Sequence, residues 1–127
     1  MAKGSGGGGR SGGEGGGKGL GSGEDAARGA QDIFSTLAPG WARSKYGDQM
    51  KESIRNASQK AYEEAFTNVM RNNMQVSAMR DNIRKAMGNR ISQLVNNSTI
   101  SNEVYRAIGV HVGDALIQNV SIARIKR

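Results

Sequence analysis

Residues 48–71, DQMKESIRNASQKAYEEAFTNVMR, form the stretch that decides the fold. Apolar residues recur in it with the 3.6-residue period of an α-helix. Asp48 is a suitable N-cap residue, and the pair Asn72-Asn73 is expected to end the helix. The stretch therefore predicts one long amphipathic helix. Its apolar stripe consists of Met50, Ile54, Ala57, Ala61, Ala65 and Val69, and is widened by Tyr62 and Phe66.

The segment that follows shows the same period and predicts a second helix. Its apolar positions begin at Val76 and Met79, and the sequence Asn96-Asn97-Ser98 is expected to stop it. Arg90 falls inside this apolar stripe, where a guanidinium must be paired, extend outward to water or face a partner. We consider Glu103 and Asp114 as its possible pairing partners. The stripe itself consists of Val76, Met79, Ile83, Met87, Ile91 and Leu94.

Residues 101–125 can be interpreted in two ways. The spacing of Ile100, Val104, Ile108, Val112 and Ala115 predicts a helix that begins near Ser101. The run Ile108–Val112, followed by Gly113-Asp114, also matches a β-hairpin with a two-residue turn. We favour the helix because its stripe extends over several turns. The expected fold is therefore all-α, a bundle of three to four helices, with an α+β fold carrying a C-terminal hairpin as the alternative.

A shorter helix is expected before residue 48. Ser22 is a suitable N-cap, and the acidic pair Glu24-Asp25 lies where the helix dipole favours negative charge. The helix should reach Leu37, because Pro39 disfavours helical geometry at the preceding residue. Residues 41–47 are ambiguous between a further turn of helix and a loop.

The N-terminal tract, residues 1–23, is rich in glycine and contains almost nothing that could be buried. Gly12, Gly17 and Lys18 match part of a phosphate-binding loop, but Gly19 stands at the Ser/Thr position and no strand can precede the tract. The tract also has too few cations for a strong nucleic-acid-binding tail. We therefore expect a disordered tether over 1–23 and a single small helical domain over 24–127.

Composition argues against several functional classes. The chain has no cysteine, which excludes disulfides and thiolate chemistry, and no apolar run long enough to span a membrane. No secretory leader is recognisable, so a cytoplasmic location is expected. His111 is the only histidine, and we expect it in the core or at its boundary with a hydrogen bond. No metal site, cofactor or catalytic constellation is predicted, and the protein is expected not to be an enzyme.

The net charge of +7 directs attention to polyanions. Residues 41–127 contain twice as many Lys and Arg as Asp and Glu residues, and cation clusters of this kind bind phosphates through counterion release. We therefore expect a small accessory protein that binds DNA or RNA largely without sequence specificity. The residues predicted to make these contacts are Arg80, Arg84, Lys85, Arg124, Lys126 and Arg127.

The alternative is an assembly or adaptor module that binds another protein, or a second copy of itself, through its C-terminal helix. Val110 and Ile117 lie on the side opposite Val104 and Ile108, so this helix is apolar on two faces. Such a helix is either central in its own bundle or buried against another chain. Because the core is thin, we favour a second chain and expect a homo-oligomer. Arg90, Val110 and Ile117 are the predicted partner interface. In composition alone the chain is similar to small proteins of phages and other mobile elements, although no motif supports that likeness.

Overall fold

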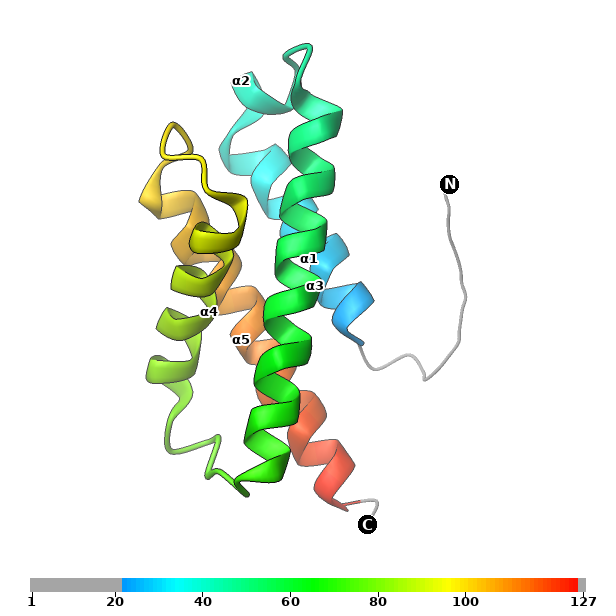
Figure 1. Ribbon diagram of the computed structural model, residues 1–127, viewed down its shortest axis with the longest axis vertical. Coiled ribbons are helices and arrows are strands. Elements are labelled where there is room, and N and C mark those ends of the chain that lie inside the picture. Colours follow the sequence, from blue (N-terminus) through cyan, green and yellow to red (C-terminus); the bar gives the residue numbers. More distant parts are fainter. Residues whose placement is uncertain (1–21, 126–127) are drawn as a thin grey trace.

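The computed structural model describes residues 22–125, and within that range the chain is mostly helical and has no strand. The four longer helices run alternately up and down the molecule, as Figure 1 shows. The expected helical class is therefore confirmed. Residues 1–21 and 126–127, which include nearly all of the predicted tail, lie outside the described range. The helices are α1 (Gly23–Leu37), α2 (Pro39–Ala42), α3 (Gly47–Arg71), α4 (Arg80–Val95) and α5 (Asn102–Ile125).

The first helix begins and ends where the sequence predicts. The Ser22 hydroxyl accepts a hydrogen bond from the backbone N–H of Asp25 at 3.2 Å, and the Asp25 carboxylate accepts one from the N–H of Ser22 at 3.4 Å. This capping box satisfies two N–H groups that would otherwise lack a partner. At the other end Pro39 takes the first position of α2, so α1 stops at Leu37.

The start of α3 differs from the prediction. The helix begins at Gly47, with Tyr46 at the N-cap position, and Asp48 lies in the first turn. Asp48 as the cap is therefore wrong. The cause is the tight corner after α2, where a Cβ atom at position 47 would collide with the carbonyl of Ala42. Glycine allows this approach, and α3 begins two residues earlier than a cap at Asp48 would give. The helix ends at Arg71, as the pair Asn72-Asn73 predicts.

The start of α4 also needs correction, because the helix begins at Arg80 and not near Val76. Val76 is nevertheless buried, with 3% of its surface exposed, and Met79 is partly buried against the same core. Both residues lie in the turn that joins α3 to α4. They are apolar because this turn packs against the core, and not because they belong to a helical stripe. At the other end Asn96 adopts a left-handed conformation, with a φ of 57°, and ends the helix as expected.

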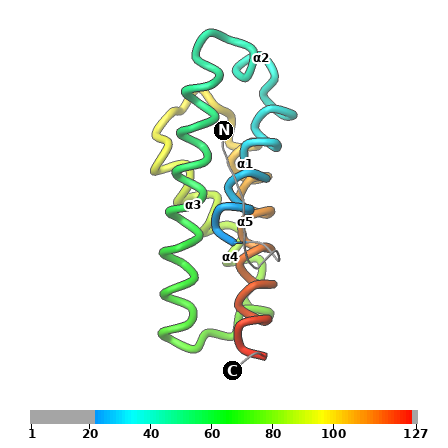
Figure 2. The backbone as a smooth tube through the Cα atoms, turned by 90° about the vertical axis from the view of Figure 1, so that its right-hand side faces the viewer, coloured from blue at the N-terminus to red at the C-terminus, as the bar shows by residue number. Residues whose placement is uncertain are grey.

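The final segment is a single helix over Asn102–Ile125, so the C-terminal hairpin does not form. α5 contacts α1, α3 and α4, and Figure 2 shows α1 and α5 side by side. This central position explains why α5 is apolar on two faces. Its buried residues are Val104, Tyr105, Ile108, Gly109, Val112, Gly113, Leu116, Ile117 and Val120.

His111 lies where α5 meets α1, which confirms its expected place at the core boundary. A Cβ atom at Gly29 of α1 would collide with the imidazole Nε2, so any larger residue at position 29 would force the His111 ring to move. The imidazole Nε2 is buried and has no hydrogen-bond partner among the described residues. His111 therefore acts as a packing residue between α1 and α5.

Candidate nucleic-acid interface

The candidate interface begins with the close approach of α4 and α5. A Cβ atom at Gly109 would lie 2.6 Å from both the carbonyl oxygen of Arg84 and the backbone N of Gly88. A Cβ atom at Gly88 would in turn lie 3.0 Å from the carbonyl oxygen of Tyr105. Gly88 and Gly109 have no side chains, so the backbones of α4 and α5 pack almost directly on each other at this point.

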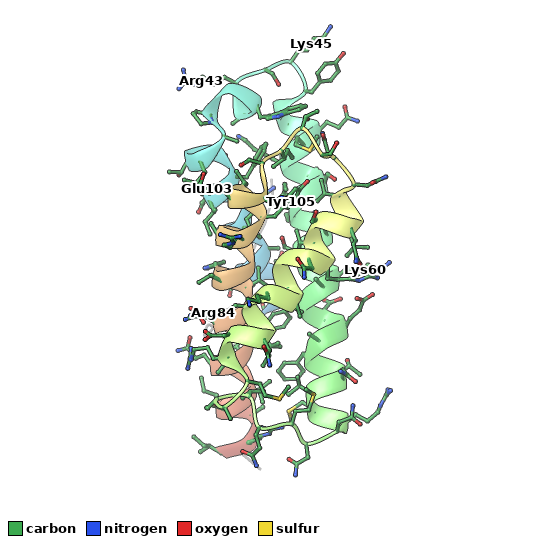
Figure 3. The ribbon with its side chains drawn as sticks, turned by 90° about the vertical axis from the view of Figure 1, so that its left-hand side faces the viewer. Arg43, Lys45, Lys60, Arg84, Glu103 and Tyr105 are labelled. Carbon is green, nitrogen blue, oxygen red and sulfur yellow. The ribbon has the colours of Figure 1, made fainter. Side chains whose placement is uncertain are left out.

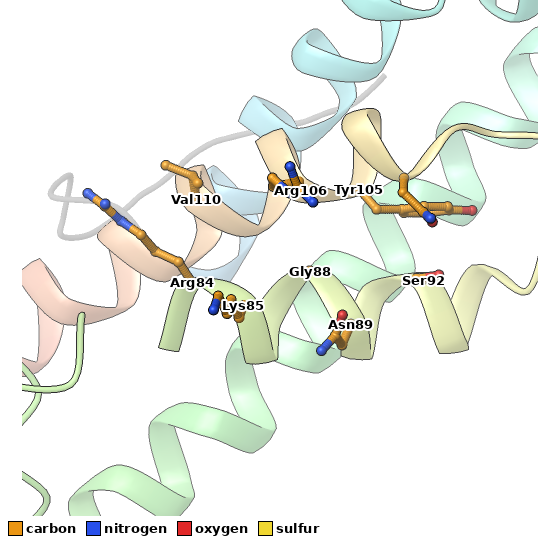
Figure 4. Close-up of a pocket in the computed structure, with 9 residues that line it drawn as sticks. Arg84, Lys85, Gly88, Asn89, Ser92, Tyr105, Arg106 and Val110 are labelled. Atoms are coloured by element: carbon orange, nitrogen blue, oxygen red, sulfur yellow. The ribbon is translucent and has the colours of Figure 1, made fainter. Parts of the chain in front are cut away.

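A groove of about 610 Å³ runs along this contact. The side chains on its two sides come from one face of α4 and one face of α5, as Figure 4 shows. We call it the basic groove. Its lining residues are Arg84, Lys85, Gly88, Asn89, Ser92, Asn102, Tyr105, Arg106 and Val110.

The charge of the basic groove comes chiefly from Lys85 on α4 and Arg106 on α5. Both side chains are exposed, and no ion pair involves either of them within residues 22–125. Asn89, Ser92 and Asn102 add neutral groups that can donate hydrogen bonds. No carboxylate is among the lining residues. The groove is therefore a strip of cations and hydrogen-bond donors, which is the chemistry that phosphate oxygens require.

Arg80 and Arg84 lie at one end of the basic groove, but both are partnered. Arg84 binds the Asp114 carboxylate through two nitrogens, with Nε–Oδ1 at 2.8 Å and Nη2–Oδ2 at 3.1 Å, and Arg80 reaches the same carboxylate at 3.2 Å. The Arg84 guanidinium holds the pKa of Asp114 below its ordinary value of 3.8, with a smaller contribution from Arg80. Part of their charge is therefore offset, although 45% of Arg80 and 31% of Arg84 remain exposed.

Arg124 lies far from the basic groove and makes contacts within the protein. Its Nη1 donates to the carbonyl of Met74 at 2.7 Å, and its Nη2 donates to the carbonyl of Val69 at 3.4 Å. These bonds link the end of α5 to the last turn of α3 and the turn that follows. The other two residues of the predicted C-terminal cluster, Lys126 and Arg127, lie outside the described residues.

We expect the exchange Arg124→Gln to lower the free energy of unfolding by about 1–2 kcal/mol, because two part-buried carbonyls lose a charged donor. Chemical denaturation followed by circular dichroism would measure this loss. Lys60→Gln removes the same charge from an exposed position and should have almost no effect. If Arg124→Gln weakens polyanion binding and leaves stability unchanged, Arg124 belongs to the interface as the sequence predicted.

Arg90 has a different partner from those predicted. Its guanidinium binds the Glu64 carboxylate of α3 through Nε at 3.0 Å and Nη2 at 3.2 Å, so pairing with Glu103 or Asp114 is wrong. The pair raises the pKa of Arg90 and lowers that of Glu64. Arg90 is thus part of the α3–α4 contact, and its guanidinium is used within the bundle.

The other two residues of the predicted partner interface differ in burial. Ile117 is 4% exposed and belongs to the core of its own bundle, so its assignment to a partner surface is wrong. Val110 is 37% exposed and forms part of the basic groove. The sequence could not separate the two, because α5 meets different neighbours along its length.

The sequence analysis missed Arg106, Asn89, Ser92 and Asn102. Their spacing does carry a signal, because Lys85, Asn89 and Ser92 share one helical face, and so do Asn102, Arg106 and Val110. What the sequence does not show is that these two faces lie next to each other. That proximity depends on the glycine contact between α4 and α5.

Comparison of the chain with models of protein families, with curated proteins and with solved structures finds no match. None of the helices within residues 22–125 combines the length and apolar character needed to cross a membrane. In the same part of the chain, no three His, Asp or Glu side chains gather in a way that could hold a metal ion.

Proposed function

We propose that this protein is a non-enzymatic nucleic-acid-binding protein that holds the phosphate backbone in the basic groove. The proposal rests on two exposed cations, Lys85 and Arg106, that face each other across the groove and have no ionic partner within residues 22–125. No carboxylate is among the residues that line the groove. Each phosphate neutralised by such a cation releases condensed counterions, which is the main source of affinity in non-specific binding.

The binding proposed is largely independent of sequence. Contacts from Lys, Arg, Asn and Ser to phosphate oxygens position a protein on nucleic acid but do not read bases. Tyr105, the aromatic residue lining the basic groove, is 4% exposed, and its hydroxyl donates to the carbonyl of Asn97 at 3.0 Å. The Tyr105 ring is therefore unable to stack on a base.

The alternative function, docking through α5, was suggested by the two apolar faces of this helix. Most of the apolar surface of α5 is covered by α1, α3 and α4 of the same chain, and Ile117 is buried among them, whereas Val110 stays exposed in the basic groove. Gly109 of α5 packs against the backbone of α4. Nucleic-acid binding is therefore the function that the described residues support best.

We expect the double variant Lys85→Ala/Arg106→Ala to bind a generic DNA duplex more weakly than the wild-type protein, whatever the duplex sequence. Because each lost phosphate contact removes about one unit of salt dependence, the slope of log K against log[salt] should fall by about two. Fluorescence anisotropy with a labelled duplex, at about 50 and 200 mM salt, would measure both quantities.

The matched control is Lys60→Ala/Arg71→Ala, which removes two exposed cations from α3. Lys60 contributes to the lowered pKa of Glu64, so its charge is already partly offset by an acidic neighbour. The control should keep most of the wild-type affinity. Equal losses in the two double variants would show that the basic groove has no special role, and a wild-type slope near zero would refute polyanion binding.

A further inference from the structure

The corner formed by residues 37–47 exposes several apolar and basic side chains. It contains α2 and the turns on either side, and it lies at one end of the bundle in Figure 1. Leu37 is 48% exposed and Tyr46 is 52% exposed, whereas Trp41 is partly buried against the core. We call this segment the α2 corner. Among the described residues, Tyr46 is the one aromatic residue whose side chain is exposed.

The α2 corner is also positively charged. Arg43 and Lys45 are exposed, as Figure 3 shows, and the segment from 37 to 47 contains no Asp or Glu. The Lys45 Nζ lies 5.2 Å from the centroid of the Tyr46 ring, a cation–π distance. The aromatic ring and a positive charge are thus held next to each other. Their separation is short enough for one nucleotide to contact the ring with its base and the charge with its phosphate.

The chemistry of the α2 corner fits an unpaired nucleotide better than a lipid surface. Interfacial helices bind membranes through a long apolar face, whereas α2 is a single turn of four residues and its Trp41 packs inward. Stacking of one base needs only one exposed ring, with a cation nearby for the phosphate. Tyr46 and Lys45 meet both requirements.

The position of the α2 corner agrees with this assignment. The basic groove extends along α4 and α5 toward Ser92 and Asn102, which flank the α4–α5 turn. Figure 1 shows this turn and α2 at the same end of the bundle. A nucleic-acid strand that leaves the groove at Asn102 therefore emerges at the end of the bundle that carries the α2 corner.

We infer that the α2 corner gives the protein a preference for single-stranded nucleic acid, with a base stacked on Tyr46 and the adjoining phosphate bound by Arg43 and Lys45. The inference rests on the proposed function, because the basic groove supplies most of the affinity. A duplex keeps its bases stacked inside the double helix, so it can occupy the groove but cannot use the Tyr46 ring.

The test compares Tyr46→Leu and Tyr46→Phe on two probes, a labelled oligothymidine and a labelled duplex. Tyr46 is exposed, so both variants should fold. We expect Tyr46→Leu to bind oligothymidine about tenfold more weakly, as for the loss of one stacked base, and Tyr46→Phe to bind it normally. Neither variant should change the affinity for the duplex. Trp41, the only tryptophan of the chain, should change its emission when oligothymidine binds.

The possible outcomes separate the two proposals. If Tyr46→Leu binds oligothymidine as the wild type does while the duplex still binds, stacking at the α2 corner is wrong and the basic groove stands. Equal losses on both probes would also refute a single-strand preference. If neither probe binds the wild type, both proposals fail. A Trp41 response to vesicles of phosphatidylserine and phosphatidylcholine, in place of oligothymidine, would assign the corner to membranes and overturn the inference.

Discussion

Replacing Ile117 with Asp is expected to lower the free energy of unfolding by about 3–5 kcal/mol, the cost of an uncompensated buried charge. Ile117 is 4% exposed and lies in a helix that contacts α1, α3 and α4. Ile117 belongs to the apolar core cluster, so a carboxylate at this position would be buried among hydrophobic side chains. Since small domains are stable by only about 5–15 kcal/mol, much of the total stability would be lost. Urea denaturation followed by circular dichroism would measure the change.

The matched control is Val110→Asp, which makes a closely similar exchange on the same helix. Val110 is 37% exposed, so the new carboxylate can reach water and the stability should change by less than about 1 kcal/mol. The sequence interpretation makes the opposite prediction for Ile117, because a partner surface would tolerate Asp in the folded monomer. A folded Ile117→Asp variant that dissociates from an oligomer would restore the assembly function.

Replacing Gly109 with Ala is expected to destabilise the protein by about 3 kcal/mol, the upper end of the range for overpacking. The exchange normally has the opposite sign within a helix, where Ala is favoured over Gly by about 0.5–1 kcal/mol. Here the added methyl group would lie 2.6 Å from the carbonyl oxygen of Arg84 and from the backbone N of Gly88. Both contacts are backbone atoms, so relief requires α4 and α5 to move apart.

Gly40→Ala is the control for this exchange, because a Cβ atom at position 40 meets nothing within 4 Å. It should leave the stability unchanged or raise it slightly through helix propensity. Thermal unfolding of the two variants would therefore give shifts of opposite sign. If Gly109→Ala stabilises the protein as Gly40→Ala does, the backbones of α4 and α5 are not in contact beside the basic groove.

Helix positions were largely predictable from local sequence. The capping pair at Ser22, the stop at Pro39 and the breaks at Asn72 and Asn96 all act within a few residues, and the structure confirms each of them. The errors arose where a tertiary contact overrides the local signal. Gly47 begins α3 because it fits beneath a carbonyl of α2, and Val76 is apolar because a loop is buried.

The candidate site was less predictable than the helices. Arg80, Arg84 and Lys85 were found as a charge cluster, but the ionic partner that Arg80 and Arg84 share is thirty or more positions away in the chain. Arg106 has no other cation near it in the sequence, and only the fold brings it to the same groove as Lys85. The charges of these residues are visible in the sequence, but whether a charge is paired is decided by other helices.

The amino-acid sequence by itself determined which residues share a helical face, because the 3.6-residue period of an α-helix is a local property. Only the tertiary structure decided which of those faces meet. Ile117 and Val110 are both apolar residues of α5, yet one is covered by its neighbours and the other borders an open groove. Burial and ion pairing depend on contacts between distant segments, and a period along the chain carries no information about them.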